Sequence, residues 1–478
     1  MVKGNTKKNI ALNLFWKFGE RVLAQGISFI VSLLLARILL PSEYGVVSLV
    51  MIFIVFADVF VVSGFSTSLI QKKDADELDF STIFYCSLFV SILIYIILFF
   101  LAPYIADFYA MPILKNVLRV FALRIPLSAL NSIQHAYVSR HMLFKKFFFS
   151  TLFGTLISGI VGIVIALLGG GVWALVAQYM TNTIVDSLVL LFTISWRPKW
   201  MFSMSAAKSL MNYGWKVLAA DFSGTFFNQL RTLIVGKFYA PDSLAYYDRG
   251  NSFASLATEN ISTAVMSVLF PAFSNESENI ENVKYMLRKA LSVMSYILFP
   301  IIVGLVLVAN PLVDFLLTDK WAGCVPFIQV LSLSALISLV GNVSLQAIKA
   351  IGRSDILLRL EFIKKPVYLI LLFIGVKFSV FAVAVTMLIY SFYSTFINVV
   401  PLKHLVNYKY SEQLQDVCKP LFITLLMAGL VFLCSLISMP SGLLLIVQIV
   451  VGMISYVLFS ILFKVEEFNI LKSMIFKG

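Results

Sequence analysis

Charged side chains interrupt stretches of the chain that are otherwise apolar enough to enter a membrane. Lysine and arginine bind phosphate groups, arginine through two parallel hydrogen bonds, so the basic members are predicted to bind the phosphates of a substrate. A carboxylate at membrane depth can take up H⁺ or Na⁺ and couple transport to an ion gradient. The predicted phosphate-binding set is Lys17, Arg21, Arg124, Lys216 and Arg231, and the predicted ion-coupling set is Glu20, Asp58, Asp221 and Glu259.

Two simpler roles remain open for these charges. Lys17 and Lys216 lie near the ends of their apolar segments, where a lysine can extend its ammonium group to the membrane surface. Opposite charges can also neutralise each other inside the protein, for example Asp221 with Arg21. Arg21 lies deeper than Lys17, and for this reason we favour a position in a cavity for Arg21.

Uncharged polar residues accompany the charged ones at helical spacing. Steps of four residues place Lys17, Arg21 and Gln25 on one face of a helix, and similar stripes occur in segments 118–139 and 213–238. Hydrogen bonding between helices explains any single polar residue, whereas several aligned stripes predict a water-filled cavity. His135, alone on an apolar helix, is interpreted as a hydrogen-bonded packing residue and not as a proton relay. The uncharged residues predicted to line the cavity are Gln25, Asn131, Asn228 and Asn342.

Most of the chain must be solvated by lipid. Of its 478 residues, 60% are hydrophobic and only 13% charged, and the mean hydropathy is +0.94. No soluble core could bury so much apolar surface, so the composition predicts an all-α polytopic membrane protein. Segment 103–117 is too short and too broken to span, and it is predicted to be an interfacial helix. The predicted spans are about 12–38, 45–70, 80–102, 118–139, 148–168, 172–194, 213–238, 250–273, 289–309, 326–349, 361–377, 379–401, 419–438 and 442–463.

The 37 lysines and arginines are distributed unevenly over the connecting segments. With the N-terminus inside, 25 of them fall in inner segments and 7 in outer segments. The positive-inside rule then predicts that both termini are cytoplasmic. The same distribution explains the net charge of +13 without nucleic acid, because the basic segments face the anionic inner leaflet.

An internal sequence repeat divides the chain into related halves. The segment 18–45 is repeated as 213–245, and the two copies share their start, a late basic residue and a closing turn with Pro41 or Pro241. Duplicated halves in a helical membrane protein predict a transporter with its site between them. The predicted divisions are a six-helix N-terminal lobe (1–199), a cytoplasmic interfacial linker (200–212), a six-helix C-terminal lobe (213–402) and two further helices with a tail (403–478).

Enzymatic and metal chemistry have no visible basis in the sequence. The four cysteines and three histidines are scattered, with no spacing typical of disulfides or metal ligands. No Walker A pattern is present, so the chain is not expected to hydrolyse ATP. We therefore predict no catalytic residue, no metal and no cofactor, apart from H⁺ or Na⁺ as a coupling ion.

One motif carries a resemblance to a known family. The sequence LLARILLPSEYGVVSLV at Leu34–Val50, followed by Gly64-Phe65 and by Ser68–Gln71, resembles the first two helices of Wzx-type oligosaccharide flippases. These flippases belong to the multidrug/oligosaccharidyl-lipid/polysaccharide (MOP) exporter superfamily, and the likeness extends through Leu118–Phe147. It is closest to the branch with the colanic acid and teichuronic acid exporters. The resemblance implies a MATE/MOP-like V of two six-helix lobes, with two C-terminal helices flanking a lipid-facing groove.

The resemblance also implies a function. Such a protein moves an undecaprenyl-diphosphate-linked repeat unit from the cytoplasmic to the outer leaflet of the bacterial inner membrane, for lipopolysaccharide or exopolysaccharide synthesis. Its expected partners are this lipid-linked oligosaccharide and membrane lipids, with a polysaccharide polymerase and a chain-length regulator as candidates and no nucleic acid. The alternatives are a MATE-like drug/cation antiporter, a membrane glycosyltransferase or polymerase, and a non-transporting envelope scaffold. An enzyme usually needs a large outer loop, and the longest outer segments here have about 17 residues, against the 4–6 of an ordinary loop.

Overall fold

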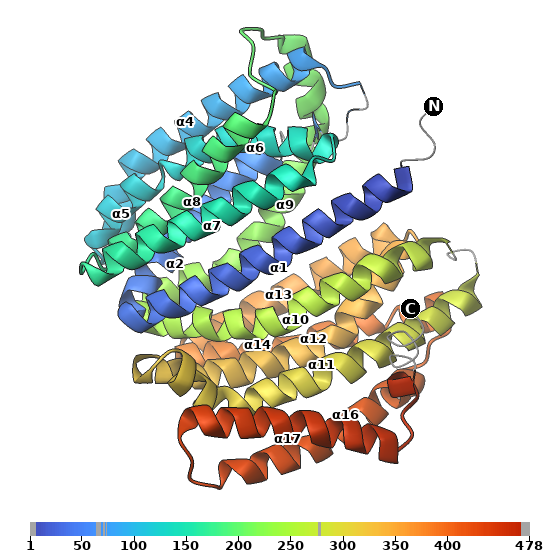
Figure 1. Cartoon of the computed structure of the whole chain (residues 1–478). Helices are drawn as coiled ribbons and strands as arrows, with labels where there is room; N and C mark the ends of the chain where they lie inside the picture. Colours follow the sequence, from blue (N-terminus) through green and yellow to red (C-terminus); the bar gives the residue numbers. More distant parts are fainter. Residues whose placement is uncertain (1–5, 64–67, 70–71, 73, 276–278, 470–478) are drawn as a thin grey trace. The chain divides into compact units, whose positions relative to one another are not determined.

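The computed structural model describes residues 6–63, 68–69, 72, 74–275 and 279–469, and for some residues within helices it describes only the backbone. In these ranges the chain consists of helices and turns, without a strand (Figure 1). Contacts within the chain divide it into two compact units, Met1–Leu244 and Ala245–Gly478. The all-α fold predicted from composition is confirmed.

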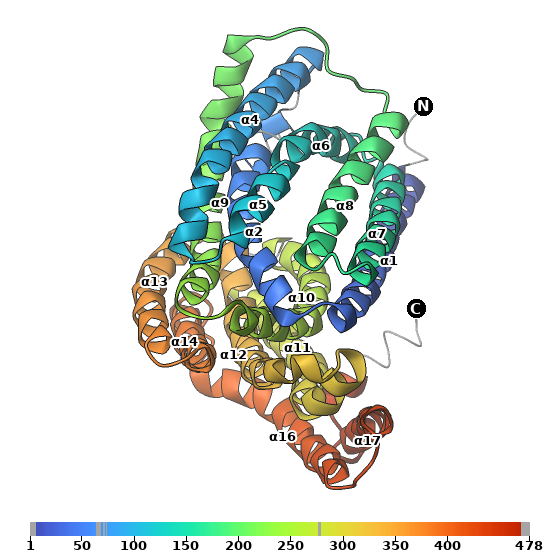
Figure 2. The ribbon, with the colours of Figure 1, turned by 90° about the vertical axis from the view of Figure 1, so that its left-hand side faces the viewer.

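The first unit is a bundle held together by contacts between successive helices and between helices distant in sequence. The hairpin of α7 and α8 packs closely, α1 lies along α7, and α6 contacts both α4 and α8. The long helix α9 covers α2 and α4 (Figure 2). The elements are α1 (Thr6–Ile38), α2 (Pro41–Asp58), the π-helix η1 (Val59–Ser63), α4 (Glu77–Phe108), α5 (Ile113–Phe121), α6 (Arg124–Arg140), α7 (Phe144–Leu167), α8 (Val172–Thr193) and α9 (Met204–Phe238).

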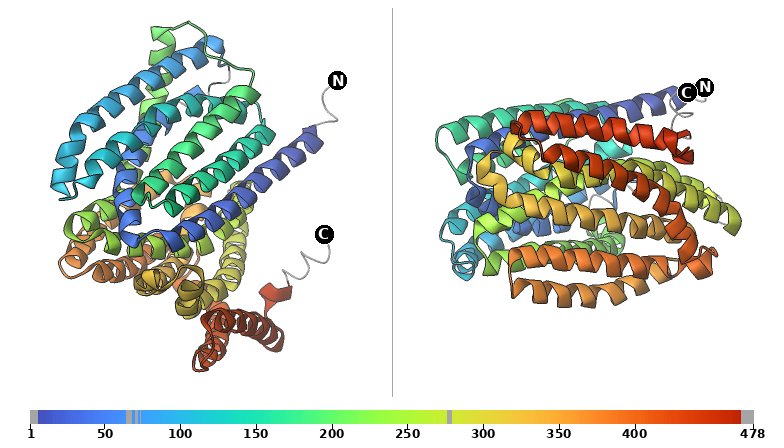
Figure 3. Two further views of the ribbon diagram at one scale, coloured as in Figure 1. Left: turned by 60° about the vertical axis from the view of Figure 1, so that its left-hand side comes forward. Right: turned by 90° about the horizontal axis from the view of Figure 1, so that it is seen from below.

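The second unit begins inside a helix, because α10 starts four residues before the boundary between the units. Its centre is the contact of α11 with α12 and of α12 with α14, and α16 and α17 lie side by side against α11 (Figure 3). The elements are α10 (Pro241–Asn275), α11 (Ile280–Leu316), the 3₁₀ helix η2 (Asp319–Cys324), α12 (Val325–Ala350), α13 (Ser354–Val376), α14 (Val380–Val399), α15 (Leu402–Leu405), α16 (Tyr410–Ser435) and α17 (Ser441–Leu462).

The repeated turn has the same local structure in both copies. Helix α1 ends at Ile38 and helix α9 at Phe238, and in each case a new helix begins with proline three residues later. Proline suits this position because its missing N–H would have no partner in the first turn of a helix. In the first copy, the Glu43 carboxylate also accepts a hydrogen bond of 2.8 Å from the Leu40 N–H. The predicted sequence repeat therefore corresponds to a structural repeat of helix, turn and helix.

Each of the fourteen predicted spans overlaps a helix. In the part of the chain that the structure describes, nine helical segments are long and apolar enough to cross a membrane by length and composition. The remaining predicted spans correspond to α1, α6, α9, α10 and α13. Helix α6 has 17 residues, and in α1 the described apolar segment is the shorter Leu23–Ile38. The total of fourteen consequently stays a prediction.

The interfacial helix predicted at 103–117 is wrong. Helix α4 continues through Pro103 to Phe108, a turn follows, and the separate helix α5 begins at Ile113. A proline removes only one helical hydrogen bond, and the long helix tolerates this loss. The helix is ended instead by Ala110, whose φ of 54° is left-handed and reverses the chain.

The predicted surface linker 200–212 is not a separate element, because Met204 begins a single helix that continues to Phe238. The Ser203 hydroxyl caps this helix by accepting a hydrogen bond from the Ala206 N–H at 3.3 Å. The predicted lobe boundaries at 199 and 213 thus lie outside and inside α9, respectively, and the division into two six-helix lobes stays a prediction.

Candidate functional site

The polar face of α6 lies inside the first unit, where it meets α2 and α8. Arg124 Nε donates a 3.0 Å hydrogen bond to Thr183 Oγ1 on α8. Ser128 forms a hydrogen bond with Asp58 on α2, and the Arg124 charge also acts on this carboxylate. Asp58 Oδ1 is buried and has no hydrogen-bond partner among the described atoms. The structure therefore brings together Arg124, predicted to bind phosphate, and Asp58, predicted to couple an ion.

A second carboxylate, Asp186 on α8, accepts hydrogen bonds from two other helices. Its Oδ2 lies 3.0 Å from His135 Nε2 and also accepts from Asn131 Nδ2, both on α6. Its Oδ1 accepts from the Ser150 hydroxyl on α7. A carboxylate with donors on both oxygens is strongly stabilised as an anion. With an imidazole at 3.0 Å, this group can also hold and exchange a proton.

The close packing of α7 on α8 positions these donors around Asp186. At Gly154 on α7, an added Cβ atom would lie 3.4 Å from Asn182 Nδ2 and 3.8 Å from Asp186 Cβ, which are ordinary contact distances. The residues Asn131, His135, Ser150 and Asp186 (hereafter the Asp186 cluster) therefore lie where α6, α7 and α8 pack together.

The sequence analysis predicted only some of the residues in the Asp186 cluster. Asn131 was predicted to line a cavity, and the structure gives it a carboxylate partner within the unit. His135 does form a hydrogen bond, and its ring also packs on Phe147 with centroids 4.7 Å apart. Asp186 was missing from the predicted sets. The signal for it was its position in an apolar span, at four-residue spacing from Gln178 and Asn182.

Other predicted residues lie on exposed faces. Lys216, Asp221 and Asn228 are exposed on α9, and Gln25 is exposed on α1. Arg231 on α9 is half-buried. In the second unit, Asn342 is exposed on α12. Exposure alone does not distinguish a side chain that lines a cavity from one that faces lipid. The predicted position of these residues along a cavity therefore stays a prediction.

The side chains of four further predicted residues, Lys17, Glu20, Arg21 and Glu259, lie outside the described residues. Their backbones belong to α1 and α10. In the ranges that are described, no group of three or more histidine, cysteine, aspartate and glutamate residues could hold a metal ion.

The two repeated turns approach each other closely within the first unit. A Cβ atom at Gly45 on α2 would lie 2.0 Å from the carbonyl oxygen of Pro241, and one at Gly236 on α9 would lie 2.2 Å from Leu49 Cδ2. At Gly45 the neighbouring atoms belong to the backbone, so only glycine fits there; at Gly236 the Leu49 side chain would have to move. The packing continues along α9, where the Phe222 ring lies 5.7 Å from the Phe56 ring.

The same end of α9 is also attached to the end of α4. Lys237 Nζ donates to the Phe108 carbonyl oxygen and lies 4.1 Å from the centroid of the Phe108 ring. The Tyr109 hydroxyl donates to the Leu233 carbonyl oxygen at 3.4 Å. The helix that begins the second sequence repeat is therefore firmly packed on helices of the first.

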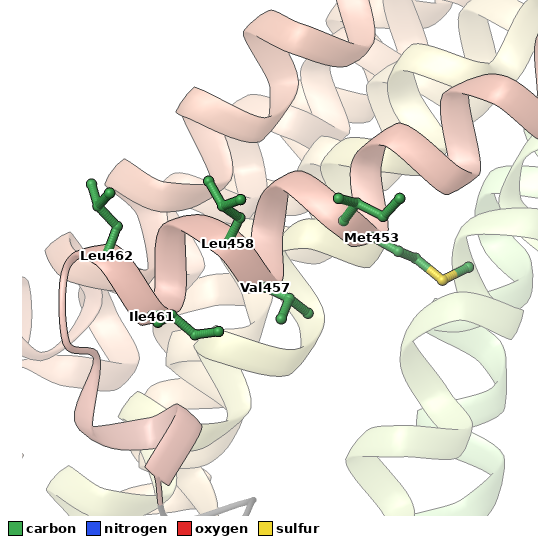
Figure 4. A pocket seen from close by; sticks show the side chains of 6 residues that line it. Met453, Val457, Leu458, Ile461 and Leu462 are labelled. Carbon is green, nitrogen blue, oxygen red and sulfur yellow. The ribbon is translucent and has the colours of Figure 1, made fainter.

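An apolar groove of about 560 Å³ follows one face of α17 in the second unit. Figure 4 shows its side chains projecting from successive turns of this helix. All of them are substantially exposed, and such a row of exposed apolar groups fits hydrocarbon better than water. The groove is lined by Met453, Ile454, Val457, Leu458, Ile461 and Leu462.

Comparison with known proteins gives a consistent result. The model of a family described as polysaccharide biosynthesis protein matches residues 34–326. The succinoglycan biosynthesis transport protein ExoT of Rhizobium meliloti (strain 1021) is 24% identical over 350 residues, which are 73% of this chain and 71% of ExoT. The teichuronic acid biosynthesis protein TuaB of Bacillus subtilis (strain 168) is 23% identical over 84% of this chain and 85% of TuaB.

A solved structure extends the comparison to the fold. The inward closed conformation of the lipid II flippase MurJ superposes with a TM-score of 0.75 at 18% identity, and the match covers 95% of this chain and 98% of MurJ. The MOP-type fold is thereby confirmed, as is the resemblance to Wzx-type flippases that the motif at Leu34–Val50 predicted.

Proposed function

Because the chain belongs to the polysaccharide biosynthesis protein family, we propose that it is a flippase for an undecaprenyl-diphosphate-linked oligosaccharide repeat unit. It moves this unit from the cytoplasmic to the outer leaflet, where surface polysaccharide is assembled. The family match, over more than half of the chain, is the observation that carries this proposal. ExoT and TuaB are named for the biosynthesis and transport of succinoglycan and for the biosynthesis of teichuronic acid, and both names support a polysaccharide precursor as the substrate.

The substrate has two parts of opposite character, and the chain offers a surface suited to each. The sugar diphosphate crosses beside the polar stripes, with Arg21 as its main ligand and Lys17, Lys216, Arg124 and Arg231 as further ligands. The prenyl tail remains in hydrocarbon, and the apolar groove on α17 (Figure 4) suits such a chain. This division avoids moving the tail through water.

Ion coupling is proposed at two part-buried carboxylates. Asp58 and Asp186 lie within the helix bundle, so a change in their charge alters hydrogen bonds that join α2, α6, α7 and α8. Donors already occupy both oxygens of Asp186, and this arrangement disfavours Na⁺, which requires a shell of oxygen ligands. The His135 imidazole beside the carboxylate is a group that can carry H⁺. Glu20, Asp221 and Glu259 remain candidates for the same role. The resulting mechanism is alternating access between the two sides of the membrane.

The protein is proposed to reside in the bacterial inner membrane with both termini in the cytoplasm, as the distribution of basic residues predicts. It acts as a transporter and not as an enzyme. A polysaccharide polymerase and a chain-length regulator are its proposed partners.

Reconstitution tests the proposal directly. Purified protein is placed in proteoliposomes with a polyprenyl-diphosphate oligosaccharide in one leaflet, and translocation is measured with a pH gradient, with a Na⁺ gradient and without a gradient. We expect transport that a pH gradient accelerates. Movement of cationic drugs in place of the oligosaccharide would favour the antiporter, and elongation of the oligosaccharide would favour a polymerase. Translocation no faster than in protein-free vesicles would support a scaffold and contradict the proposal.

A further inference from the structure

A polar pocket of about 230 Å³ lies in the second unit between α11, α16 and the residues that follow α17. Its lining combines side chains of both charges with two polar donors. The lining residues are Tyr285, Arg288, Lys289, Ser292, Val293, Asp416, Glu466 and Glu467. Such a mixture is uncommon in a chain of which only 13% is charged.

One pair of charges in this lining is already neutralised. Arg288 donates from Nε and Nη2 to the two oxygens of Asp416 at 2.8 and 2.7 Å. The Tyr408 hydroxyl donates to the same carboxylate at 2.6 Å. Burial raises the pKa of Tyr408, and the accepting carboxylate raises it further, so the hydroxyl remains a donor at neutral pH. Arg288 and Asp416 therefore form a fixed wall of the pocket, and Tyr408 holds Asp416 from behind it.

Glu467 is not neutralised in this way. It is only 9% exposed, and its Oε1 accepts a hydrogen bond from the Ser292 hydroxyl. Its Oε2 is buried and has no hydrogen-bond partner among the described atoms. A buried carboxylate oxygen without a donor is costly, and this position therefore requires a cationic or donating ligand.

The opposite charge is available in the same pocket. Lys289 is partly exposed, with Nζ 3.9 Å from Glu466 Oε2 and 5.8 Å from the Tyr285 ring. Both contacts are long, so the ammonium group can turn to an incoming anion. The pocket thus presents an acceptor at Glu467 and a donor at Lys289, which suits a zwitterion. A divalent metal fits poorly, because the described residues contain no metal-binding group and Arg288 and Lys289 would repel it.

The position of the pocket along the helices identifies the zwitterion. The predicted spans of α11 and α16 begin near 289 and 419, and that of α17 ends near 463. The lining residues therefore lie at the depth of the lipid headgroups. The volume equals about eight times the ~30 Å³ that a water molecule occupies in the liquid, enough for a small headgroup.

We propose that this pocket binds the phosphoethanolamine headgroup of a membrane phospholipid. The primary ammonium donates to Glu467 Oε2, and the phosphate accepts from Lys289. A bound headgroup then joins α11, α16 and the chain after α17, and it strengthens the attachment of the last two helices to the rest of the unit. This inference does not depend on the transported substrate.

Lipid retention by the purified full-length protein tests the proposal. The probes are phosphatidylethanolamine, phosphatidylcholine and phosphatidylglycerol with identical acyl chains, added in detergent and measured by native mass spectrometry. Phosphatidylcholine has the same phosphate, but its trimethylated nitrogen has no N–H to donate to Glu467. We expect phosphatidylethanolamine to be retained at least several-fold better than the other two lipids.

Two variants test the contacts with the ammonium group and with the phosphate group separately. Glu467→Gln should abolish the preference for phosphatidylethanolamine over phosphatidylcholine, and Lys289→Gln should weaken the retention of both lipids together. The control is Asp355→Asn, an exposed carboxylate outside the pocket, which should retain the wild-type preference. Thermal unfolding in lipid-free detergent shows whether each variant is folded.

Three results would overturn the proposal. The wild type could retain all three lipids equally, it could prefer phosphatidylglycerol, as a purely cationic site would, or Glu467→Gln could leave the preference intact. The comparison of lipids on the wild-type protein is decisive even if the Glu467 variant fails to fold.

Discussion

Replacement of Gly45 by alanine should disfavour the conformation in which α2 meets the turn between α9 and α10. The added Cβ atom would lie 2.0, 2.5 and 2.8 Å from the O, C and Cα atoms of Pro241. All three are backbone atoms, so no side-chain rotation relieves the clash, and the helices must separate by about 1 Å. Overpacking costs about 1–3 kcal/mol, and the upper value applies to a contact this short. Alanine regains about 1 kcal/mol of helix propensity.

The net cost is about 2 kcal/mol, or a shift of about 30-fold in the conformational equilibrium. The assay is polysaccharide export in a strain that lacks its own flippase, with the membrane content of the variant measured by immunoblotting. We expect a marked loss of export and a lower thermal midpoint in detergent. The matched control is Gly26→Ala on α1, because a Cβ atom there meets nothing within 4 Å. If Gly45→Ala behaves as Gly26→Ala does, the close approach of the two turns is not part of the transport cycle.

Three further predictions concern charged residues. Arg21→Ala should abolish export while the protein stays in the membrane, because the main diphosphate ligand is lost; normal export would remove Arg21 from the site. Asp186→Asn should remove the acceleration of oligosaccharide translocation by a pH gradient in proteoliposomes, since an amide cannot exchange the proton; an unchanged gradient response would exclude the Asp186 cluster from coupling. Arg288→Lys should lower the thermal midpoint slightly, because a partly screened bidentate pair with Asp416 contributes about 1 kcal/mol or less. Arg353→Lys, which alters an equally bidentate but fully exposed pair, should leave the midpoint unchanged, and equal effects would contradict this reasoning.

The helices were largely predictable because hydropathy and turn chemistry are local properties. Pro41 and Pro241 begin helices in both copies, as the sequence repeat predicted, and the short segment around Lys377 separates α13 from α14. The failure at 103–117 has a local cause as well. Pro103 is the helix-breaking residue visible in this segment, yet the helix continues through it. The helix ends at the left-handed Ala110, and an alanine does not predict that conformation.

The candidate site was less predictable, because a stripe of polar residues does not reveal what lies opposite. Periodicity placed Arg124 and Asn131 on one face of a helix. It could not show that this face meets Asp58, Thr183 and Asp186 within the same unit. Hydrogen-bond partners depend on which helices become neighbours, and that is settled by tertiary packing. Asp186 was left out of the predicted sets because its partners are distant in sequence.

The packing of α9 on α2, η1 and α4 determines where the chain can be cut into two polypeptides. The sequence repeat suggests two portable halves that could be produced as separate polypeptides by cutting between Thr193 and Met204. Such a cut would assign α9 to the C-terminal piece, although its contacts with α2, η1 and α4 belong to the N-terminal one. The N-terminal fragment would then expose the rings of Phe56 and Phe60, which pack on Phe222 of α9, and the backbone at Gly45, which Pro241 contacts. The repeat in the sequence and the compact units of the folded protein therefore have different borders.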